Sequence, residues 1–155
     1  RRTFRMTPPE LSEGLPLMLV LNAGLDSGLM MPQYTAAALV SDNKTLAHPD
    51  SVDSIPSSAN QEDHVSMGAN AARHALEILE NVRLVLAVEL LTAAQAIDLR
   101  PEGPSRLGRG TAAAHRRLRE AVTFLDRDRQ LSPDIEALAE LIGSEQLVQA
   151  VESVR

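Results

Sequence analysis

Apolar positions repeat with the period of an α-helix over one long stretch of the chain, between Gly68 and Arg100. They lie three or four residues apart, at Leu76, Leu79, Val82, Leu86, Leu90, Ala93 and Ile97. At 1.5 Å per residue, the pattern predicts one helix of roughly 50 Å, which Pro101 ends. From Leu84 to Leu91 the only polar residue is Glu89, so we expect this part to be buried on every side. A chain of 155 residues can hardly surround such a rod, which indicates a helical bundle completed by other chain segments or subunits.

Shorter helices are expected on both sides of the long one. An Ala-rich helix lies within residues 25–47, with Asp26 or Ser27 as its N-cap, and Pro32 either begins the helix or kinks it. A second amphipathic helix covers Thr111 to Leu125. The sequence Ser132-Pro133-Asp134 favours a helix start, with a cap, a proline at the first position and an acid near the positive end.

The rest of the pattern sets the organisation of the chain. Residues 1–23 are expected to be irregular because prolines interrupt them, although the apolar run from Leu15 to Leu21 should pack on something. The C-terminal helix should stop at Gly143-Ser144, before a last short helix from Glu145 to Val154. We therefore expect one all-α domain in four parts. These are an entry loop with the Ala-rich helix (1–47), a polar loop (48–67), the long core helix (68–100) and C-terminal helices (101–155).

The polar loop 48–67 is the best place to look for a functional site, because loops carry function when a rigid scaffold positions them. Between Thr45 and Ala72 there is no Lys or Arg. Four carboxylates lie in the same stretch, on Asp50, Asp53, Glu62 and Asp63. They must face water, meet cations from elsewhere in the molecule, or take up protons.

Composition narrows the class of protein. Aromatic residues make up only 2% of the chain against 44% hydrophobic residues, which favours closely packed helices over a sheet. A net charge of −6 argues against a general nucleic-acid binder. The absence of cysteine excludes disulfides and thiolate chemistry and fits a reducing, cytoplasmic location. No stretch is apolar enough to predict a membrane span, and the spacing of the four histidines predicts no metal site.

Two charged features require partners. Glu89 lies in an apolar stretch, so we expect an Arg or polar partner from another helix, possibly in another subunit. The basic residues between Arg106 and Arg119 could form an anion-binding or nucleic-acid patch. We favour a solvated helix face paired with Glu120, Asp126 and Asp128, since charge runs in an acidic domain usually cover a solvated face.

The loop and its flanks closely resemble the histidine ammonia-lyases, within the aromatic amino-acid ammonia-lyase superfamily. The strongest matching segments are Thr35–Lys44, Leu46–Pro49, Ser51–Pro56 and Ser58–Gly68. Weaker similarity follows in Ala71–His74, Gln95–Arg100 and Leu131–Ile135. The run Gln61-Glu62-Asp63-His64 looks like the histidine-specific branch, because relatives acting on phenylalanine or tyrosine typically have Gln-Asp in place of Gln61-Glu62.

The resemblance implies a mostly helical homotetramer with long helices at its centre, which eliminates ammonia from L-histidine to give trans-urocanate. In this family an Ala-Ser-Gly tripeptide cyclises to methylidene-imidazolone, the electrophile of the reaction, but these 155 residues contain no Ala-Ser-Gly. The family's catalytic tyrosines and its substrate-binding arginine also correspond to segments before Arg1. The chain therefore resembles the C-terminal third of such an enzyme. It is expected to depend on the remainder of the enzyme chain and to be inactive alone.

The resemblance places Glu62 next to the substrate as a catalytic residue, with Gln61 and Asn60 as substrate-binding supports. A buried Glu can hold a cationic or N–H group and move a proton, and a side-chain amide can donate and accept hydrogen bonds at once. Without the resemblance, a solvated loop carboxylate and plain turn capping would be the better interpretations. Asp63 and His64 are expected to open the next helix. The alternative function is a helical interaction module without chemistry of its own.

Overall fold

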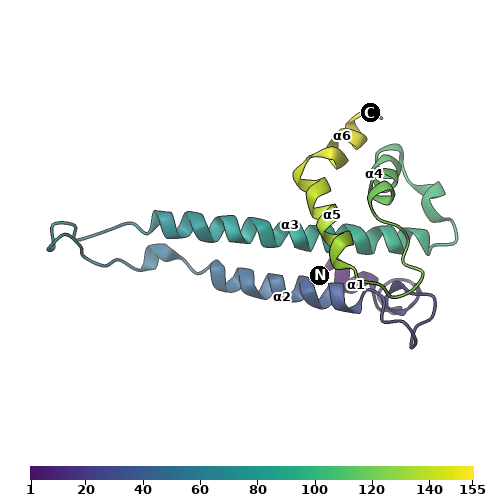
Figure 1. The fold of residues 1–155 in the computed structure, drawn as a ribbon, viewed down its shortest axis with the longest axis horizontal. Coiled ribbons are helices and arrows are strands. Elements are labelled where there is room, and N and C mark those ends of the chain that lie inside the picture. The colour runs from purple at the N-terminus through teal and green to yellow at the C-terminus, as the bar shows by residue number, and fades with distance from the viewer.

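The computed structural model describes all 155 residues as helices and loops, with two isolated β-bridges and no sheet (Figure 1). The all-α prediction is confirmed. In chain order the α-helices are α1 (Arg2–Met6), α2 (Met30–Leu46), α3 (Gly68–Asp98), α4 (Arg109–Ala121), α5 (Ser132–Gly143) and α6 (Gln146–Glu152). Three 3₁₀ turns lie between them, at Leu17–Leu19, Asp50–Val52 and Gly103–Arg106.

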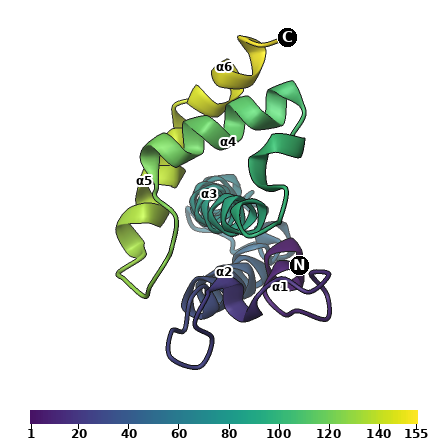
Figure 2. The same ribbon diagram turned by 90° about the vertical axis from the view of Figure 1, so that its right-hand side faces the viewer.

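The molecule consists of an arm and a body, which share α3. Helices α2 and α3 run side by side as the arm, and the polar loop joins them at its far tip (Figure 1). Helices α4, α5 and α6 gather at the other end of α3 to form the body. Seen along α3, helices α1 and α2 lie on one side of it and α4 to α6 on the other (Figure 2). The long predicted helix is thus confirmed as the element around which the others are arranged.

The hydrophobic core surrounds the C-terminal half of α3. Small residues on this helix, Ala87 and Ala94, let neighbouring segments approach closely around the buried Leu91. The apolar run before α2 supplies Leu19 and Val20, as the sequence predicted for a run that must pack on something. The other members are Leu15, Leu29, Ala96, Leu118, Val122, Leu125, Leu138, Ala139 and Leu141. Each fully buried leucine contributes about 1.5–3 kcal/mol to the free energy of folding.

The cover over α3 decreases from the body towards the loop. Val88 is fully buried, but Leu86 remains 37% exposed, and towards the loop Leu76 and Leu79 are 68% and 65% exposed. The expectation that Leu84 to Leu91 is buried on every side, with other chain segments or subunits completing the cover, stays a prediction, because this chain by itself covers that stretch only in part. The reason is geometric: towards the loop, α3 packs only against α2 and the 3₁₀ turn Asp50–Val52, which lie on one side of it (Figure 1).

The start of α2 differs from the prediction as well. The helix begins at Met30, its N-cap is Leu29, and neither Asp26 nor Ser27 caps it with a side chain. The side chain of Asp128, about a hundred residues later, accepts hydrogen bonds from the backbone N–H groups of Ser27 (2.7 Å) and Gly28 (2.8 Å). The Asp128 carboxylate thus holds the segment just before the helix, and no side chain caps the helix itself. Pro32 lies in the first turn of the helix, so of the two outcomes considered for it the structure favours a helix start over a kink.

The N-terminal residues are more ordered than expected. Prolines do interrupt the segment, but α1 forms ahead of them, where the sequence predicted no helix. Its residue Arg2 pairs with Glu89 on α3, with Nε to Oε1 at 2.5 Å and Nη2 to Oε2 at 3.0 Å. This tertiary ion pair is not visible in local propensity, which explains why the helix was missed.

Helix α4 ends earlier than its amphipathic pattern predicted. It stops at Ala121, and the chain continues extended through Val122 to bury Leu125 in the core. The cause is Gln95 of α3, a fully buried amide. Its Nε2 donates to the carbonyls of Leu125 (2.8 Å) and Leu19 (3.1 Å), and its Oε1 accepts from the Leu125 N–H (3.0 Å). These bonds hold the backbone at Leu125 away from a helical path.

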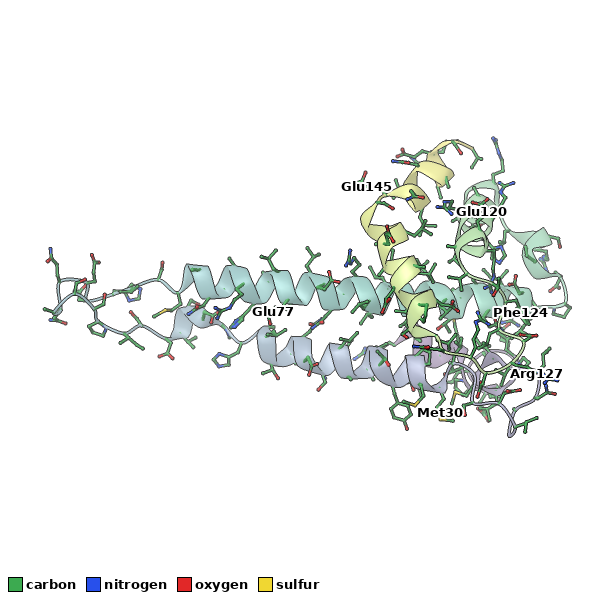
Figure 3. All side chains as sticks on the ribbon, in the orientation of Figure 1. Met30, Glu77, Glu120, Phe124, Arg127 and Glu145 are labelled. Atoms are coloured by element: carbon green, nitrogen blue, oxygen red, sulfur yellow. The ribbon has the colours of Figure 1, made fainter.

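The start of α5 and the break between α5 and α6 lie where the sequence predicted them. Helix α5 starts at Ser132 with proline in its first turn, but Ser132 is not the predicted cap: the N-cap is Leu131, and no side chain caps the helix. Asp134 in the first turn pairs with Arg129 at 2.7 Å. It ends at Gly143, and Glu145 takes a left-handed backbone (φ +59°) before α6 begins. Figure 3 shows side chains crowded in the body around the labelled Phe124 and Arg127, and standing apart along the arm near Glu77.

Candidate functional site

The candidate site is the loop that connects α2 to α3, at the end of the arm most distant from the body (Figure 1). It leaves α2 through the 3₁₀ turn Asp50–Val52, runs outward to a tip near Asn60, and returns to Gly68. At the tip the two sides of the loop form a backbone pair. Ser57 N–H donates to the Glu62 carbonyl (3.0 Å), and Glu62 N–H donates to the Ser57 carbonyl (3.3 Å). The loop is therefore a hairpin, and Glu62 is one of its paired residues.

The tip itself has an unusual backbone. Ser58, Ala59 and Asn60 all have positive φ, at +54°, +53° and +68°. Three consecutive non-glycine residues in the left-handed region are strained, although asparagine tolerates this region better than most residues. Strain of this kind persists only where surrounding structure holds it, and it concentrates at functional sites. It turns the chain so that Asn60, Gln61 and Glu62 follow one another at the exposed end of the hairpin.

The structure brings the three predicted site residues together but gives them no partners. Asn60, Gln61 and Glu62 are all exposed, and none of their side chains forms a hydrogen bond or ion pair within the chain. The burial expected around a catalytic Glu is thus not supplied by these 155 residues. What the arrangement offers is one carboxylate and two amides, presented together at a strained and solvent-facing tip.

The other carboxylates of the loop have two different environments. Asp50 meets His74 of α3, with Oδ2 at 3.1 Å from Nδ1, while Asp53 and Asp63 face water. The prediction that Asp63 and His64 open the next helix is wrong, because α3 begins only at Gly68. The physical reason lies across the hairpin. The Ser54 hydroxyl bonds the backbone of Val65, which ties this segment to the opposite side of the hairpin ahead of the helix.

Comparison with known proteins identifies the family of this chain. The family model described as aromatic amino acid lyase matches residues 1–120. The chain belongs to the aromatic amino acid lyase family. Among curated relatives, histidine ammonia-lyase from Symbiobacterium thermophilum is 61% identical over 154 residues, which cover 99% of this chain and 30% of the relative. The same enzyme from Natranaerobius thermophilus is 55% identical over 152 residues, again with 30% of the relative covered.

The fold is also found in solved structures of this lyase family. The crystal structure of histidine ammonia-lyase from Trypanosoma cruzi superposes with a TM-score of 0.93 at 43% sequence identity. The match covers 99% of this chain and 30% of that one. The chain thus spans about a third of the length of the relatives it matches, and its helices reproduce part of the ammonia-lyase fold.

Two further results bear on the chemistry open to this lyase segment. No group of three or more His, Asp or Glu side chains lies close enough together to hold a metal ion. No helix is long and apolar enough to cross a membrane. Three small hollows lie beside the root of the loop, at about 190, 270 and 210 Å³.

The charged pairs elsewhere in the lyase segment are mostly structural. The expectation that Glu89 has an arginine partner on another helix is confirmed by Arg2 of α1. A hydrogen bond from Arg2 to Glu89, together with the Glu89 charge, raises the pKa of the Arg2 guanidinium. Three of the basic residues of α4 are paired, namely His115, Arg117 and Arg119, and Arg117 contacts Glu120 at 3.3 Å.

The acidic partners of α4 are not all those predicted. Asp98 of α3 accepts from Arg119 (2.8 Å) and lies 2.9 Å from His115, whereas Asp128 caps the segment before α2. Burial lowers the pKa of Arg119, and the charge of Asp98 opposes that shift. The sequence carried one usable signal for this network: Asp98 and Gln95 lie three residues apart on an otherwise apolar stretch of α3.

Sequence reasoning also missed the residues that hold the loop in shape. Ser54 and the pair of Asp50 with His74 cross-link the hairpin and its root, and none of them was singled out as a partner. The only available signal for Asp50 was the general one, that four loop carboxylates without a local cation need partners.

Proposed function

We propose that this chain is the C-terminal segment of a histidine ammonia-lyase, and that its loop supplies Asn60, Gln61 and Glu62 to one wall of the active site. The observation that carries the proposal is the hairpin tip. It holds a carboxylate and two amides exposed, on strained backbone, with no partner inside the chain. Such a tip is suited to a site that other segments complete. The identity to curated histidine ammonia-lyases supports histidine as the substrate.

The chemistry assigned to this segment is binding, orientation and proton handling. Elimination converts L-histidine to trans-urocanate and ammonia, so the C–N bond breaks and a proton leaves the neighbouring carbon. The Glu62 carboxylate can accept a charge-assisted hydrogen bond from the substrate ammonium or from an imidazole N–H, and it can carry a proton. Gln61 and Asn60 can orient the substrate, because an amide offers both a donor and an acceptor.

The family's prosthetic group would come from outside this segment. Methylidene-imidazolone supplies an electrophile when it is present, and it forms from Ala-Ser-Gly. No such tripeptide occurs among the 155 residues, so the chain cannot form the group itself. The segment is accordingly proposed to be inactive alone and to need the remainder of the enzyme chain.

A chimera tests the proposed function directly. The matching 154 residues of the Symbiobacterium thermophilum enzyme are replaced by this chain, and histidine consumption is followed through the ultraviolet absorbance of urocanate. We expect urocanate formation, with little or no product from phenylalanine or tyrosine, and no turnover by the 155-residue chain alone. A chimera that folds and assembles as its parent does, yet forms no urocanate, would contradict the proposal.

The exposed apolar residues of the arm support assembly with further copies of the enzyme. Leu76, Leu79, Val82 and Leu86 lie along one stretch of α3 and remain exposed within this chain. Contiguous apolar surface of this kind marks an interaction site. We propose that long helices from other subunits cover it in a homotetramer, as the resemblance implies.

Changing that surface should break the assembly. Leu79→Glu combined with Leu76→Glu is expected to shift the chimera from its oligomer to smaller species in light scattering, because two buried charges cannot be solvated at an apolar interface. Leu25→Glu is the control, since this residue is 87% exposed in a loop before α2. An unchanged mass in the double variant would exclude this face as the interface.

The exposed apolar face of α3 also allows a test of the alternative function, a helical interaction module. A helical interaction module would use the apolar face of α3 for assembly but would have no chemistry. It predicts an oligomeric chimera that depends on Leu76 and Leu79 and never forms urocanate. Urocanate formation therefore decides between the two functions.

A further inference from the structure

Three cross-links determine the path of the loop from α2 to α3. At the root, Asp50 pairs with His74 on α3 at 3.1 Å. Midway, the Ser54 hydroxyl accepts from the Val65 N–H at 2.9 Å and lies 3.3 Å from the Val65 carbonyl, to which it donates. At the tip, Ser57 and Glu62 exchange their backbone hydrogen bonds. No other side-chain hydrogen bond joins the two sides of the loop.

The Ser54 contact is the central one of the three. Ser54 lies three residues before Ser57, and Val65 lies three residues after Glu62. The contact is therefore the same number of residues from the tip pair on both sides of the hairpin. One hydroxyl satisfies both the donor and the acceptor of a single backbone residue, which fixes the register of the two sides. Ser54 and Val65 are also partly buried, whereas the tip residues are exposed.

The tip needs this support for physical reasons. An isolated two-stranded hairpin is marginally stable in water, and the single backbone pair at Ser57 and Glu62 closes a turn of four residues, three of them left-handed. Without the Ser54–Val65 hydrogen bonds behind it, the strained turn would relax, and Glu62 would lose its fixed position. Val65 lies three residues after Glu62 on the same side of the hairpin, so the Ser54 hydroxyl acts on Glu62 through that short stretch of backbone.

We propose that Ser54 is a positioning residue for Glu62, and that Asp50 and His74 anchor the root of the same hairpin. This inference rests on the proposed function, in which Glu62 meets the substrate. Ser54 touches neither substrate nor reacting atoms in this scheme. Its role is to keep the carboxylate in register, and a small displacement of a catalytic group is enough to cost about a hundredfold in rate.

The test compares Ser54→Ala with Ser54→Thr in the chimera. The alanine variant loses the hydroxyl and is expected to lower kcat by about tenfold to a hundredfold with a smaller change in KM, since the effect is on orientation of the acting group. The threonine variant keeps the hydroxyl and should restore most of kcat. Ser51→Ala is the matched control, because Ser51 is exposed in the same loop and its hydroxyl forms no hydrogen bond. Unchanged melting temperatures would show that the fold is intact.

Amide hydrogen exchange on the 155-residue chain gives a readout that does not depend on turnover. We expect faster exchange at Val65 and Glu62 in Ser54→Ala, normal exchange in Ser54→Thr, and no change in the C-terminal half of α3. Unchanged exchange at both amides, or a kcat within twofold of the parent in Ser54→Ala, overturns the positioning role. A chimera already inactive with Ser54 intact counts against the proposed function alone, and the exchange result then decides the inference about Ser54.

Discussion

Glu62→Gln should lower kcat for urocanate formation in the chimera by about 10²–10⁴-fold, the range typical for loss of a positioned proton-transfer group. Gln keeps the size of the side chain and its ability to accept a hydrogen bond, but it removes the charge and the ability to carry a proton. The stability of the protein should not change, because Glu62 is exposed at the tip and contacts no other side chain. A normal melting temperature with a collapsed kcat is the expected result.

The neighbouring carboxylate provides the control. Asp63→Asn makes the same chemical change one position later, in a residue that is also exposed and unpaired. It is expected to leave kcat within a few-fold of the parent. If Glu62→Gln also retains the parent rate while the chimera is active, the assignment of Glu62 as a catalytic residue is wrong. Equal losses in both variants would point to the net charge of the loop instead of to Glu62.

Gln95→Ala is expected to destabilise the chain by about 3 kcal/mol or more, the largest stability effect we foresee for one substitution. The side chain is almost completely buried and joins three segments. Its Nε2 bonds two carbonyls, and its Oε1 accepts from Leu125 N–H and from Arg119 at 3.4 Å. Alanine leaves these groups buried without partners, and each such group costs about 1–3 kcal/mol. The truncation also leaves a cavity.

Urea denaturation measures this effect, with Gln149→Ala as the control. Gln149 is an exposed glutamine on α6, so its truncation should change the free energy of unfolding by less than about 0.5 kcal/mol. In Gln95→Ala the segment around Leu125 should also lose amide protection, because its backbone partner is gone. A loss below about 1 kcal/mol would show that water replaces the amide without difficulty, and that Gln95 does not organise this junction.

Local sequence patterns predicted much of the fold. The apolar period from residue 68 predicted α3 to within two residues of its observed end, and Ser132-Pro133-Asp134 predicted the start of α5. These features are readable because a helix places residues three and four apart on one face, and because proline and glycine act within one turn. The resemblance of the loop likewise singled out Asn60, Gln61 and Glu62, and the structure places all three at one hairpin tip.

Contacts between distant residues decided the rest. Helix α4 ends at Ala121 because Gln95 holds the backbone at Leu125, and the chain before α2 is capped by Asp128. Neither effect follows from propensity, since each depends on one side chain meeting a backbone group 30 or about a hundred residues away. The register of the site loop is of the same kind, because it depends on Ser54 meeting Val65 across the hairpin. The sequence alone thus predicted α2 to α6, but not α1, and it proposed the residues that carry chemistry. Only the tertiary structure decided where α4 stops and how the loop that presents Glu62 is held, because long-range hydrogen bonds leave no periodic trace along a chain.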